Sequence, residues 1–224
     1  MLINSPTRIA PFTWSVVIPV KVLTQAKSRL GQFGAQRRAE LALAMAADTI
    51  IAVRACEQVN RVIVVTDDKV AGDALAVHGA MVIADPVDGP ADRLNAALSH
   101  GAVHARAIGP GSGIAALFAD LPAVRPDEIS RALIAAAAWP AAFVADAAGE
   151  GTTLYTARPG VGFQPSFGVA SRARHAAGGA VELNLAGIPG LRQDVDTPED
   201  LTAATAIGLG RNTADLLRCG PLGR

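Results

Sequence analysis

The chain has 224 residues, with 20 basic and 20 acidic side chains, and half of its residues are apolar although only 4% are aromatic. This length fits one hydrophobic core, and no long linker interrupts it, so we expect a single domain. The zero net charge, without a basic stretch that alternates with aromatics, excludes a broad nucleic-acid-binding surface.

The cysteines and the apolar stretches indicate the compartment. Cys56 and Cys219 are far apart, without a CxxC or a His cluster nearby, which excludes a disulfide framework and a zinc site. The apolar stretches are too short for a membrane span, and residues 1–14 lack the order of a signal peptide. We therefore expect a cytoplasmic protein without a membrane partner.

Short Val/Ile runs alternate with Ala-rich stretches in the first half of the chain, after an N-terminal arm at residues 1–13. This alternation predicts βαβ units and a largely parallel sheet covered by helices. The predicted strands cover 15–20, 61–66, 81–84 and 114–119, and the predicted helices cover 36–55, 69–77, 91–106 and 126–138.

The second half has a more mixed pattern. Strands are predicted at 141–145 and 152–156, on either side of a Gly149–Gly151 turn. Thr197 and Pro198 predict the start of a helix of about ten residues. We place the domain at 14–208 and expect the Gly/Pro-containing tail at 209–224 to have little to pack against.

Three cations follow the first predicted strand. In open parallel sheets ligands bind beyond the carboxyl ends of the strands, so polar residues at these points are candidates for a site. Lys21, Lys27 and Arg29 are suited to a polyphosphate, which requires point charges and a forked guanidinium. The alternative is a solvated helix start. The sequence contains no GxxxxGK[ST] and no GxGxxG, which disfavours Walker-type NTPases and dinucleotide-binding dehydrogenases.

Three acids are candidate Mg²⁺ ligands. Asp120 follows the strand predicted at 114–119, where a carboxylate is well placed to hold Mg²⁺ against nucleotide phosphates. Asp194 and Asp196 are two residues apart, so in an extended chain both side chains leave the same face. Alternatively, Asp120 caps a turn, and Asp196 adds charge near the positive end of the helix at Thr197.

Two glycine-containing loops offer backbone N–H groups to an acidic ligand. They are Gly149–Thr153 and 167–175, the second with added cations. A glycine-rich turn between strands is more often a hairpin, and His175 in the second loop is more often structural.

Five motifs occur in an order that resembles one family: Pro19-Val20-Lys21 with Ala26–Leu30, Ala119–Pro122, Gly149–Thr152, Phe167-Gly168 with Ser171, and Asp194–Pro198. The chain is similar to the phosphoenolpyruvate / 2-phospho-L-lactate guanylyltransferases of coenzyme F-420 biosynthesis, from about Trp14 to Gly208. The resemblance implies a Rossmann-like nucleotidyltransferase fold of the glycosyltransferase-A type, Mg²⁺ dependence, GTP as donor and phosphoenolpyruvate as the favoured acceptor. Relatives often carry Gly where this chain has Ala119, which leaves the metal carboxylate in place.

The resemblance also implies residue roles. Lys21, Lys27 and Arg29 would bind the triphosphate, and Asp120, Asp194 and Asp196 the metal. Thr152, Gly168 and Ser171 match the positions that bind the acceptor. Asn95 falls where relatives read the base, although a polar residue at a helix start explains it equally well. Catalysis would be positioning and charge neutralisation by Lys27, Arg29 and Asp120 during in-line attack on the α-phosphorus.

Several alternatives stay open. 2-phospho-L-lactate and 3-phosphoglycerate are alternative acceptors, which the residues do not distinguish from phosphoenolpyruvate. A molybdopterin-type or sugar-phosphate nucleotidyltransferase would share the fold and the acids but not the paired glycine loops. A non-catalytic GTP-binding protein is the alternative from another class, which the set of three acids disfavours. Because the product anhydride is labile, functional coupling to the downstream transferase of the pathway is also expected.

Overall fold

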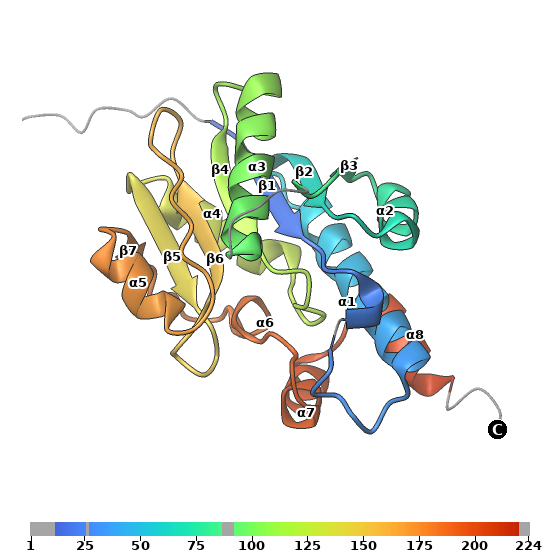
Figure 1. Cartoon of the computed structure of the whole chain (residues 1–224). Coiled ribbons are helices and arrows are strands. Elements are labelled where there is room, and N and C mark those ends of the chain that lie inside the picture. Colours follow the sequence, from blue (N-terminus) through green and yellow to red (C-terminus); the bar gives the residue numbers. More distant parts are fainter. Residues whose placement is uncertain (1–11, 26, 87–91, 220–224) are drawn as a thin grey trace, which may run out of the picture.

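The structure of the chain is a computed structural model that describes residues 12–25, 27–86 and 92–219. A seven-stranded sheet in the order β3-β2-β1-β4-β6-β5-β7 lies between two layers of helices (Figure 1). The strands are β1 (Trp14–Pro19), β2 (Val59–Val65), β3 (Met81–Ile83), β4 (Gly113–Leu117), β5 (Ala141–Ala145), β6 (Thr152–Ala157) and β7 (Val181–Glu182). The helices are η1 (Leu23–Gln25), α1 (Ala35–Arg54), α2 (Lys69–Ala76), α3 (Arg93–Ile108), α4 (Pro126–Ala136), α5 (Ser171–Ala177), α6 (Pro189–Arg192), α7 (Pro198–Ile207) and α8 (Arg211–Arg218).

One strand of the sheet is reversed. Strands β1 to β4 run parallel to one another, β6 runs antiparallel to β4 and to β5, and β7 runs parallel to β5. The predicted α/β fold with a mixed, mostly parallel sheet and helices on both faces is confirmed. The reversal brings the β5–β6 turn to the edge of the sheet where β1 and β4 have their carboxyl ends, since Leu117 pairs with Leu154 and Ala145 with Thr152.

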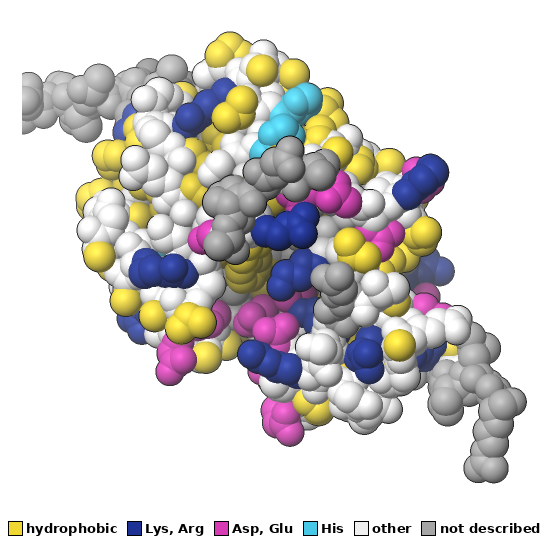
Figure 2. All heavy atoms as spheres, in the orientation of Figure 1, with side chains coloured by type: hydrophobic (Ala, Val, Ile, Leu, Met, Phe, Trp, Pro, Cys, Tyr) yellow, Lys and Arg dark blue, Asp and Glu magenta, His cyan; other side chains and the backbone are white. Residues whose placement is uncertain are grey.

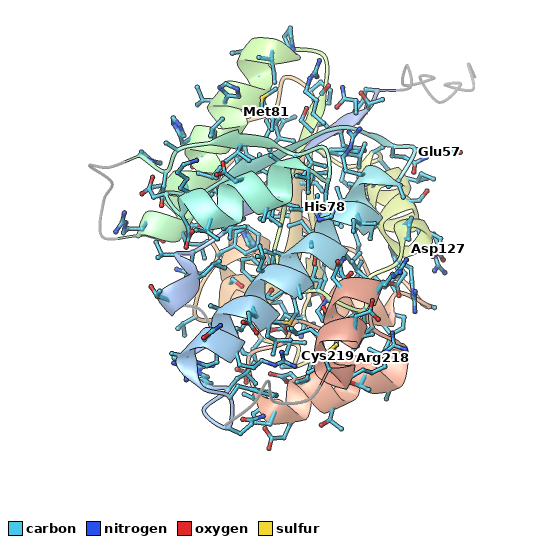
Figure 3. The ribbon with its side chains drawn as sticks, turned by 90° about the vertical axis from the view of Figure 1, so that its right-hand side faces the viewer. Glu57, His78, Met81, Asp127, Arg218 and Cys219 are labelled. Carbon is cyan, nitrogen blue, oxygen red and sulfur yellow. The ribbon has the colours of Figure 1, made fainter. Side chains whose placement is uncertain are left out.

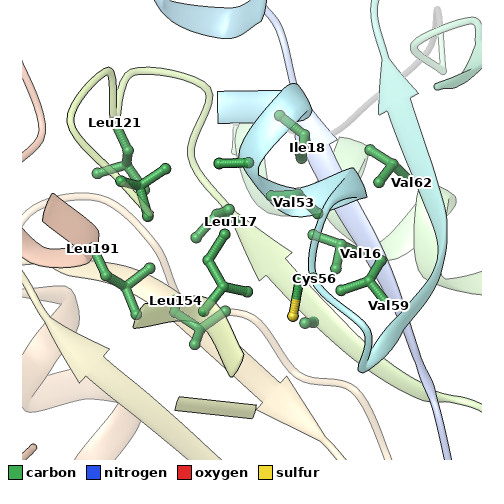
Figure 4. Close-up of a cluster of buried hydrophobic side chains, with 14 of the residues drawn as sticks. Val16, Ile18, Val53, Cys56, Val59, Val62, Leu117, Leu121, Leu154 and Leu191 are labelled. Atoms are coloured by element: carbon green, nitrogen blue, oxygen red, sulfur yellow. The ribbon is translucent and has the colours of Figure 1, made fainter. Parts of the chain in front are cut away.

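The core forms two apolar layers, one on each face of the sheet. Successive side chains of a strand point to opposite faces, so Val16 and Ile18 pack toward α1 while Val17 packs toward α3. Figure 4 shows part of the first layer, where Val53 of α1 meets Val16 and Ile18 of β1, with Leu117 and Leu154 on the neighbouring strands. Because these Val/Ile runs are continuous, both faces of each strand are apolar and both are buried under helices.

Helix α3 lies unusually close to β1 at Gly101. A Cβ built on Gly101 would lie 2.4 Å from Cγ1 of Val17 and 3.0 Å from Cγ2 of Val65. Glycine therefore fixes how near the helix approaches the sheet, and with it the position of the amino end of α3 at the edge described below.

The predicted elements agree with the structure to within two residues at each end, with Ala91 outside the described residues. The predicted helix after Thr197 is α7, where Thr197 Oγ1 accepts the Asp200 N–H. Helices α5, α6 and α8 and strand β7 were not predicted. Helices α5 and α6 have seven and four residues, and strand β7 has two. A periodic pattern cannot develop over such short lengths.

The prediction that the tail beyond Gly208 has little to pack against is wrong for residues 211–218. They form α8, which packs on α1 (Figure 1), and Figure 3 shows Arg218 and Cys219 at its end. The Asp48 carboxylate of α1 accepts the N–H groups of Asn212 (3.0 Å) and Thr213 (2.8 Å), which satisfies the first turn of α8. A helix start capped from a distant helix has no local sequence signal.

The division of the chain into arm, domain and tail otherwise stays a prediction. Of the predicted arm, residues 12 and 13 lie in the described part, and the Phe12 ring packs edge-on against Trp14 at 5.1 Å. Within the described ranges, every helix falls short of the length and apolarity needed to cross a membrane.

Candidate active site

A pocket of about 350 Å³ opens at the carboxyl ends of β1 and β4. Figure 2 shows basic and acidic side chains gathered around a hollow near the middle of this face. The apolar wall includes Leu23, Leu94 and Phe118. The polar side chains that line the pocket are Lys21, Lys27, Ser28, Arg29, Asp120, Asp194 and Asp196. The pocket therefore joins the three predicted cations to the three predicted acids, although up to 175 positions separate them along the chain.

Lys27 is the central cation of the pocket. Its Nζ lies 2.5 Å from Oδ2 of Asp120 and 3.0 Å from Oδ1 of Asp196, and its side chain is 9% exposed. Burial alone would lower the pKa of Lys27, but the carboxylates of Asp120 and Asp196 raise it above the ordinary value. The ammonium is therefore charged and neutralises part of the acidic cluster.

Arg29 and Lys21 face solvent at the rim of the pocket. Nη1 of Arg29 lies 3.8 Å from Oδ2 of Asp196, and the Arg29 side chain is 74% exposed. Lys21 is also exposed. No acid among the described residues holds either side chain tightly, so both are placed to contact an incoming polyphosphate.

The loop after β1 is anchored at its beginning. Asp68, which caps α2 by accepting the Ala71 N–H, also accepts the Leu23 N–H at 2.8 Å. The hydrogen bond from Leu23 holds the pKa of Asp68 below its ordinary value. Further along the loop, Lys27 adopts a positive φ of 54°, a conformation that costs a non-glycine residue energy and is found disproportionately at functional sites.

Asp120 and the Asp194/Asp196 pair meet through their backbones. The Val195 N–H donates to the Asp120 carbonyl at 3.1 Å, and the buried Val195 side chain leaves both flanking aspartates on the pocket side. Burial, together with the negative charges of Asp120, Asp196 and Asp146, raises the pKa of Asp194 to about 7.

The donor set suits Mg²⁺, which prefers carboxylate oxygens. Oδ1 of Asp120 is buried and has no hydrogen-bond partner in the described structure, so this oxygen can accept a cation. Within the described residues, however, no three acidic, His or Cys side chains already surround a common metal position. The Lys27 ammonium lies between Asp120 and Asp196 instead, so Mg²⁺ binding by these acids stays a prediction.

A second pocket of about 190 Å³ adjoins the first. The two pockets share Pro19, Val20, Lys21 and Leu94. The second pocket is lined by the acids Asp67 and Asp85, by Arg93 and by apolar Val65 and Ala97. Burial, and secondly the charge of Asp67, raises the pKa of Asp85.

Asn95 holds a loop rather than lining either pocket. Its Oδ1 accepts the Phe167 N–H at 2.8 Å, and its Nδ2 donates to the Phe167 carbonyl at 3.0 Å and to Asp92 Oδ2 at 2.6 Å. Both N–H groups of the amide and one acceptor position of its oxygen thus tie the amino end of α3 to the 166–168 loop. Base reading by Asn95 stays a prediction.

The predicted acceptor-binding residues lie beyond Phe118, outside the lining of the large pocket. The Thr152 and Ser171 side chains are buried, at 1% and 2% exposed, while Gly168 is exposed and has a φ of 111°. The Phe167 ring packs against Phe118 at 4.9 Å, which connects this loop to the pocket wall. Direct contact of Thr152 and Ser171 with an acceptor therefore stays a prediction.

His175 has a structural role, as the sequence suggested. Its Nε2 accepts the Ser166 N–H at 2.9 Å, so the ring proton is on Nδ1, which donates to Thr152 Oγ1 at 3.0 Å. The imidazole stacks on Tyr155 at 4.6 Å. Burial, and then the charge of Arg174, lowers the pKa of His175 to about 4, which keeps it neutral.

Sequence reasoning missed Asp146, which shapes the turn between β5 and β6. Its carboxylate accepts the N–H groups of Glu150 (3.0 Å) and Gly151 (2.8 Å). Asp146 directly follows the predicted strand at 141–145, so the rule that selected Asp120 would also have selected it. The turn is a hairpin, and its N–H groups are satisfied by the protein itself.

Comparisons with known proteins identify the family of the chain. A sequence model of the family described as "Guanylyl transferase CofC like" matches residues 14–219. Proteins named phosphoenolpyruvate guanylyltransferase are similar: that of Thermomonospora curvata is 55% identical over 92% of this chain and 90% of its own, and that of Streptomyces scabiei 54% over 90% and 94%.

Solved structures show the same fold. A putative nucleotide-diphospho-sugar transferase from Desulfovibrio desulfuricans superposes with a TM-score of 0.65 at 18% identity, over 92% of this chain and 94% of its own. A nucleotidyl transferase from Methanothermobacter thermautotroptrophicus gives 0.56 at 21% identity, over 93% and 99%. With a family match over nearly all of the described residues and relatives above 50% identity, the chain belongs to the CofC-like guanylyl transferase family.

Proposed function

We propose that the protein transfers the GMP moiety of GTP to phosphoenolpyruvate, releasing pyrophosphate and forming enolpyruvyl-diphospho-guanosine. The observation that carries the proposal is the pocket in which Lys27 joins Asp120 to Asp196, with Lys21 and Arg29 at its rim. The names of the relatives that are about half identical supply the donor group and the acceptor. We place the reaction in cytoplasmic coenzyme F-420 biosynthesis, upstream of a transferase that consumes the labile product.

The donor triphosphate would bind at the cationic rim. Lys21 and Arg29 are exposed on the loop after β1, where they reach outward to phosphate oxygens. Lys27 and Arg29 would stabilise the charge that builds up on the leaving pyrophosphate. Asp120, with Asp194 and Asp196, would hold Mg²⁺, which when bound neutralises phosphate charge and brings donor and acceptor phosphates together.

The chemical step is an in-line displacement. A phosphate oxygen of the acceptor attacks the α-phosphorus, the new P–O bond forms, and the bond to the bridging oxygen breaks as pyrophosphate leaves with the electron pair. A phosphate oxygen is already anionic, so no side chain has to remove a proton. The protein contributes positioning and charge neutralisation, which alone supply a large part of such rate enhancements.

The acceptor would lie on the side of the pocket toward Phe118 and the 166–171 loop. Exposed Gly168 offers its backbone there, and Thr152 and Ser171 shape the loop from beneath. The guanine base would lie in the adjoining pocket, where Asp67 and Asp85 supply acceptors. Guanine presents N1–H and N2–H donors together, whereas adenine has an acceptor at N1, so a carboxylate there favours GTP.

The test is product identification with purified full-length protein and MgCl₂, with GTP, ATP or CTP supplied as the nucleotide. Phosphoenolpyruvate, 2-phospho-L-lactate and 3-phosphoglycerate are supplied in competition, and products are identified by mass spectrometry while pyrophosphate is measured. We expect the phosphoenolpyruvate anhydride to dominate. A product from another acid would refute phosphoenolpyruvate as the acceptor, and a product from ATP or CTP would refute GTP as the donor. GTP binding without pyrophosphate release would indicate a non-catalytic GTP-binding protein.

A matched pair of variants ties turnover to the pocket. Asp120→Ala should abolish pyrophosphate release while the protein stays folded. Asp127→Ala removes an acid that is exposed on α4 and paired with Arg131, and it should leave turnover unchanged. Full activity in Asp120→Ala would show that Asp120 is not needed for turnover.

A further inference from the structure

One buried hydroxyl holds the backbone on both sides of Asp120. Thr49 of α1 has no exposed surface, and its Oγ1 accepts the Leu121 N–H at 3.2 Å. The hydroxyl proton is shared between the carbonyls of Ala119 (3.1 Å) and Met45 (2.9 Å). The residues immediately before and after Asp120 therefore contact the same oxygen atom.

The remaining support of this loop comes from backbone groups. The Val195 N–H donates to the Asp120 carbonyl at 3.1 Å, and the Gly210 N–H donates to the Pro122 carbonyl at 2.7 Å. Among the described side chains, Thr49 is the one that hydrogen-bonds to the backbone of residues 119–122. It connects the loop to α1, a twenty-residue helix packed on the sheet.

The direction of the Asp120 carboxylate depends on this backbone. Its Oδ2 contacts Lys27 and its Oδ1 is buried without a partner, so no neutral side chain among those described fixes the carboxylate directly. We propose that Thr49 is a positioning residue that holds Asp120 in the orientation needed for a metal-bound nucleotide. This proposal rests on the proposed function, because it assumes that Asp120 faces a metal.

The hydroxyl is the part of Thr49 that the proposal requires. Valine has nearly the same shape, but it would leave the Leu121 N–H and the Ala119 carbonyl without their side-chain partner in the interior. The loop would then shift to find other partners, and Asp120 would move with it. Serine keeps the hydroxyl and should keep the orientation.

The experiment compares three variants of the full chain: Thr49→Val, Thr49→Ser and a control, Thr156→Val. Thr156 is also buried, and its Oγ1 donates to the Ala142 carbonyl at 3.0 Å between β6 and β5, away from Asp120. The control therefore loses one buried hydroxyl-to-carbonyl hydrogen bond that does not involve the loop of Asp120. Thermal midpoints report the fold, and Mn²⁺ binding with GTP but no acceptor, followed by electron paramagnetic resonance, reports the metal site.

We expect Thr49→Val to weaken Mn²⁺ binding by about 10- to 100-fold, the usual effect of losing a group that orients a metal ligand. The Mg²⁺ concentration for half-maximal turnover should rise by a similar factor, and kcat should fall more than KM for GTP changes at saturating metal. Thr49→Ser should restore these values. Thr156→Val should lower the thermal midpoint and leave the metal values unchanged.

Equal thermal losses in the two valine variants with unchanged Mn²⁺ binding would make Thr49 merely structural and overturn the proposal. If Thr49→Val does not fold, Thr49→Ala is compared with Thr156→Ala by the same criteria. Wild-type protein that holds no Mn²⁺ with GTP would also overturn it. Wild-type protein that holds Mn²⁺ but acts on none of the three acids would refute the proposed acceptor and leave the Thr49 comparison valid.

Discussion

His175 should make the protein lose stability as the pH falls from 7 to 5. In the folded chain the ring is neutral, because Nε2 accepts the Ser166 N–H and burial lowers its pKa from 6.5 to about 4. The unfolded chain binds a proton near pH 6.5, so between these two pKa values it holds more protons than the folded chain and is stabilised relative to it as the pH falls. With 1.36 kcal/mol per pKa unit, the loss of unfolding free energy from pH 7 to pH 5 is about 2 kcal/mol.

Asp194 acts in the opposite direction. Burial and neighbouring acids raise its pKa to about 7, so the folded chain takes up that proton first and is stabilised as the pH falls. The stability of the wild-type protein alone therefore does not isolate His175. The informative quantity is the difference between the wild-type protein and His175→Gln, which keeps a hydrogen-bonding side chain but does not titrate.

The assay is urea unfolding at pH 7 and pH 5, followed by tryptophan fluorescence, with Trp14 buried as the reporter of the core. From pH 7 to pH 5, the wild-type protein should lose about 2 kcal/mol more than His175→Gln. His100→Gln is the matched control, because it makes the same substitution at an exposed position. Parallel pH profiles for the wild-type protein and His175→Gln would refute the reasoning.

Three further predictions concern packing and charge. Gly101→Ala places a Cβ 2.4 Å from Val17 and should destabilise the fold by about 1–3 kcal/mol in urea unfolding, whereas Gly111→Ala, with nothing within 4 Å, should be nearly neutral; equal effects would contradict the close approach of α3. Asp48→Ala removes the acceptor of the Asn212 and Thr213 N–H groups, so it should lower the free energy of unfolding by about 2 kcal/mol and speed hydrogen exchange in α8. Asp73→Ala on the surface is the control and should do neither. Slow exchange in α8 of Asp48→Ala would argue against the cap. Lys27→Met should lower kcat on the order of 100-fold, with exposed Lys69→Met as the control, and unimpaired turnover would show that Lys27 is dispensable.

The long elements could be predicted because each carries its own periodic signal. Runs such as Val62–Val65 are apolar on both sides of the strand, and helix starts such as Thr197-Pro198 carry their cap locally. Helix α8 could not be predicted in this way, since the acceptor for its first N–H groups is Asp48, far earlier in the chain. The reversal of β6 likewise follows from a hairpin turn whose acceptor, Asp146, sequence reasoning passed over.

The candidate site shows a similar division. Strand ends select Asp120 and the loop of Lys27 because parallel strands bring their carboxyl ends to one edge, and the structure brings these residues together. Burial, by contrast, depends on packing: Thr152 and Ser171 are covered by elements that no motif describes. The Asn95 amide hydrogen-bonds to Phe167, which lies 72 positions later in the chain, so no local pattern indicates this contact. Thr49 is likewise not distinguished in the sequence from the other polar residues of an Ala-rich helix.

The docking of α8 has a consequence for the order in which the protein matures on the ribosome. Gly210, Asn212 and Thr213 are synthesised long after the loop of Asp120, yet they satisfy the Pro122 carbonyl and the Asp48 carboxylate beneath that loop. Until they emerge, the Asp48 carboxylate and the Pro122 carbonyl lack these donors. A nascent chain that has formed the sheet therefore gains this support for the loop of Asp120 only when α8 has docked.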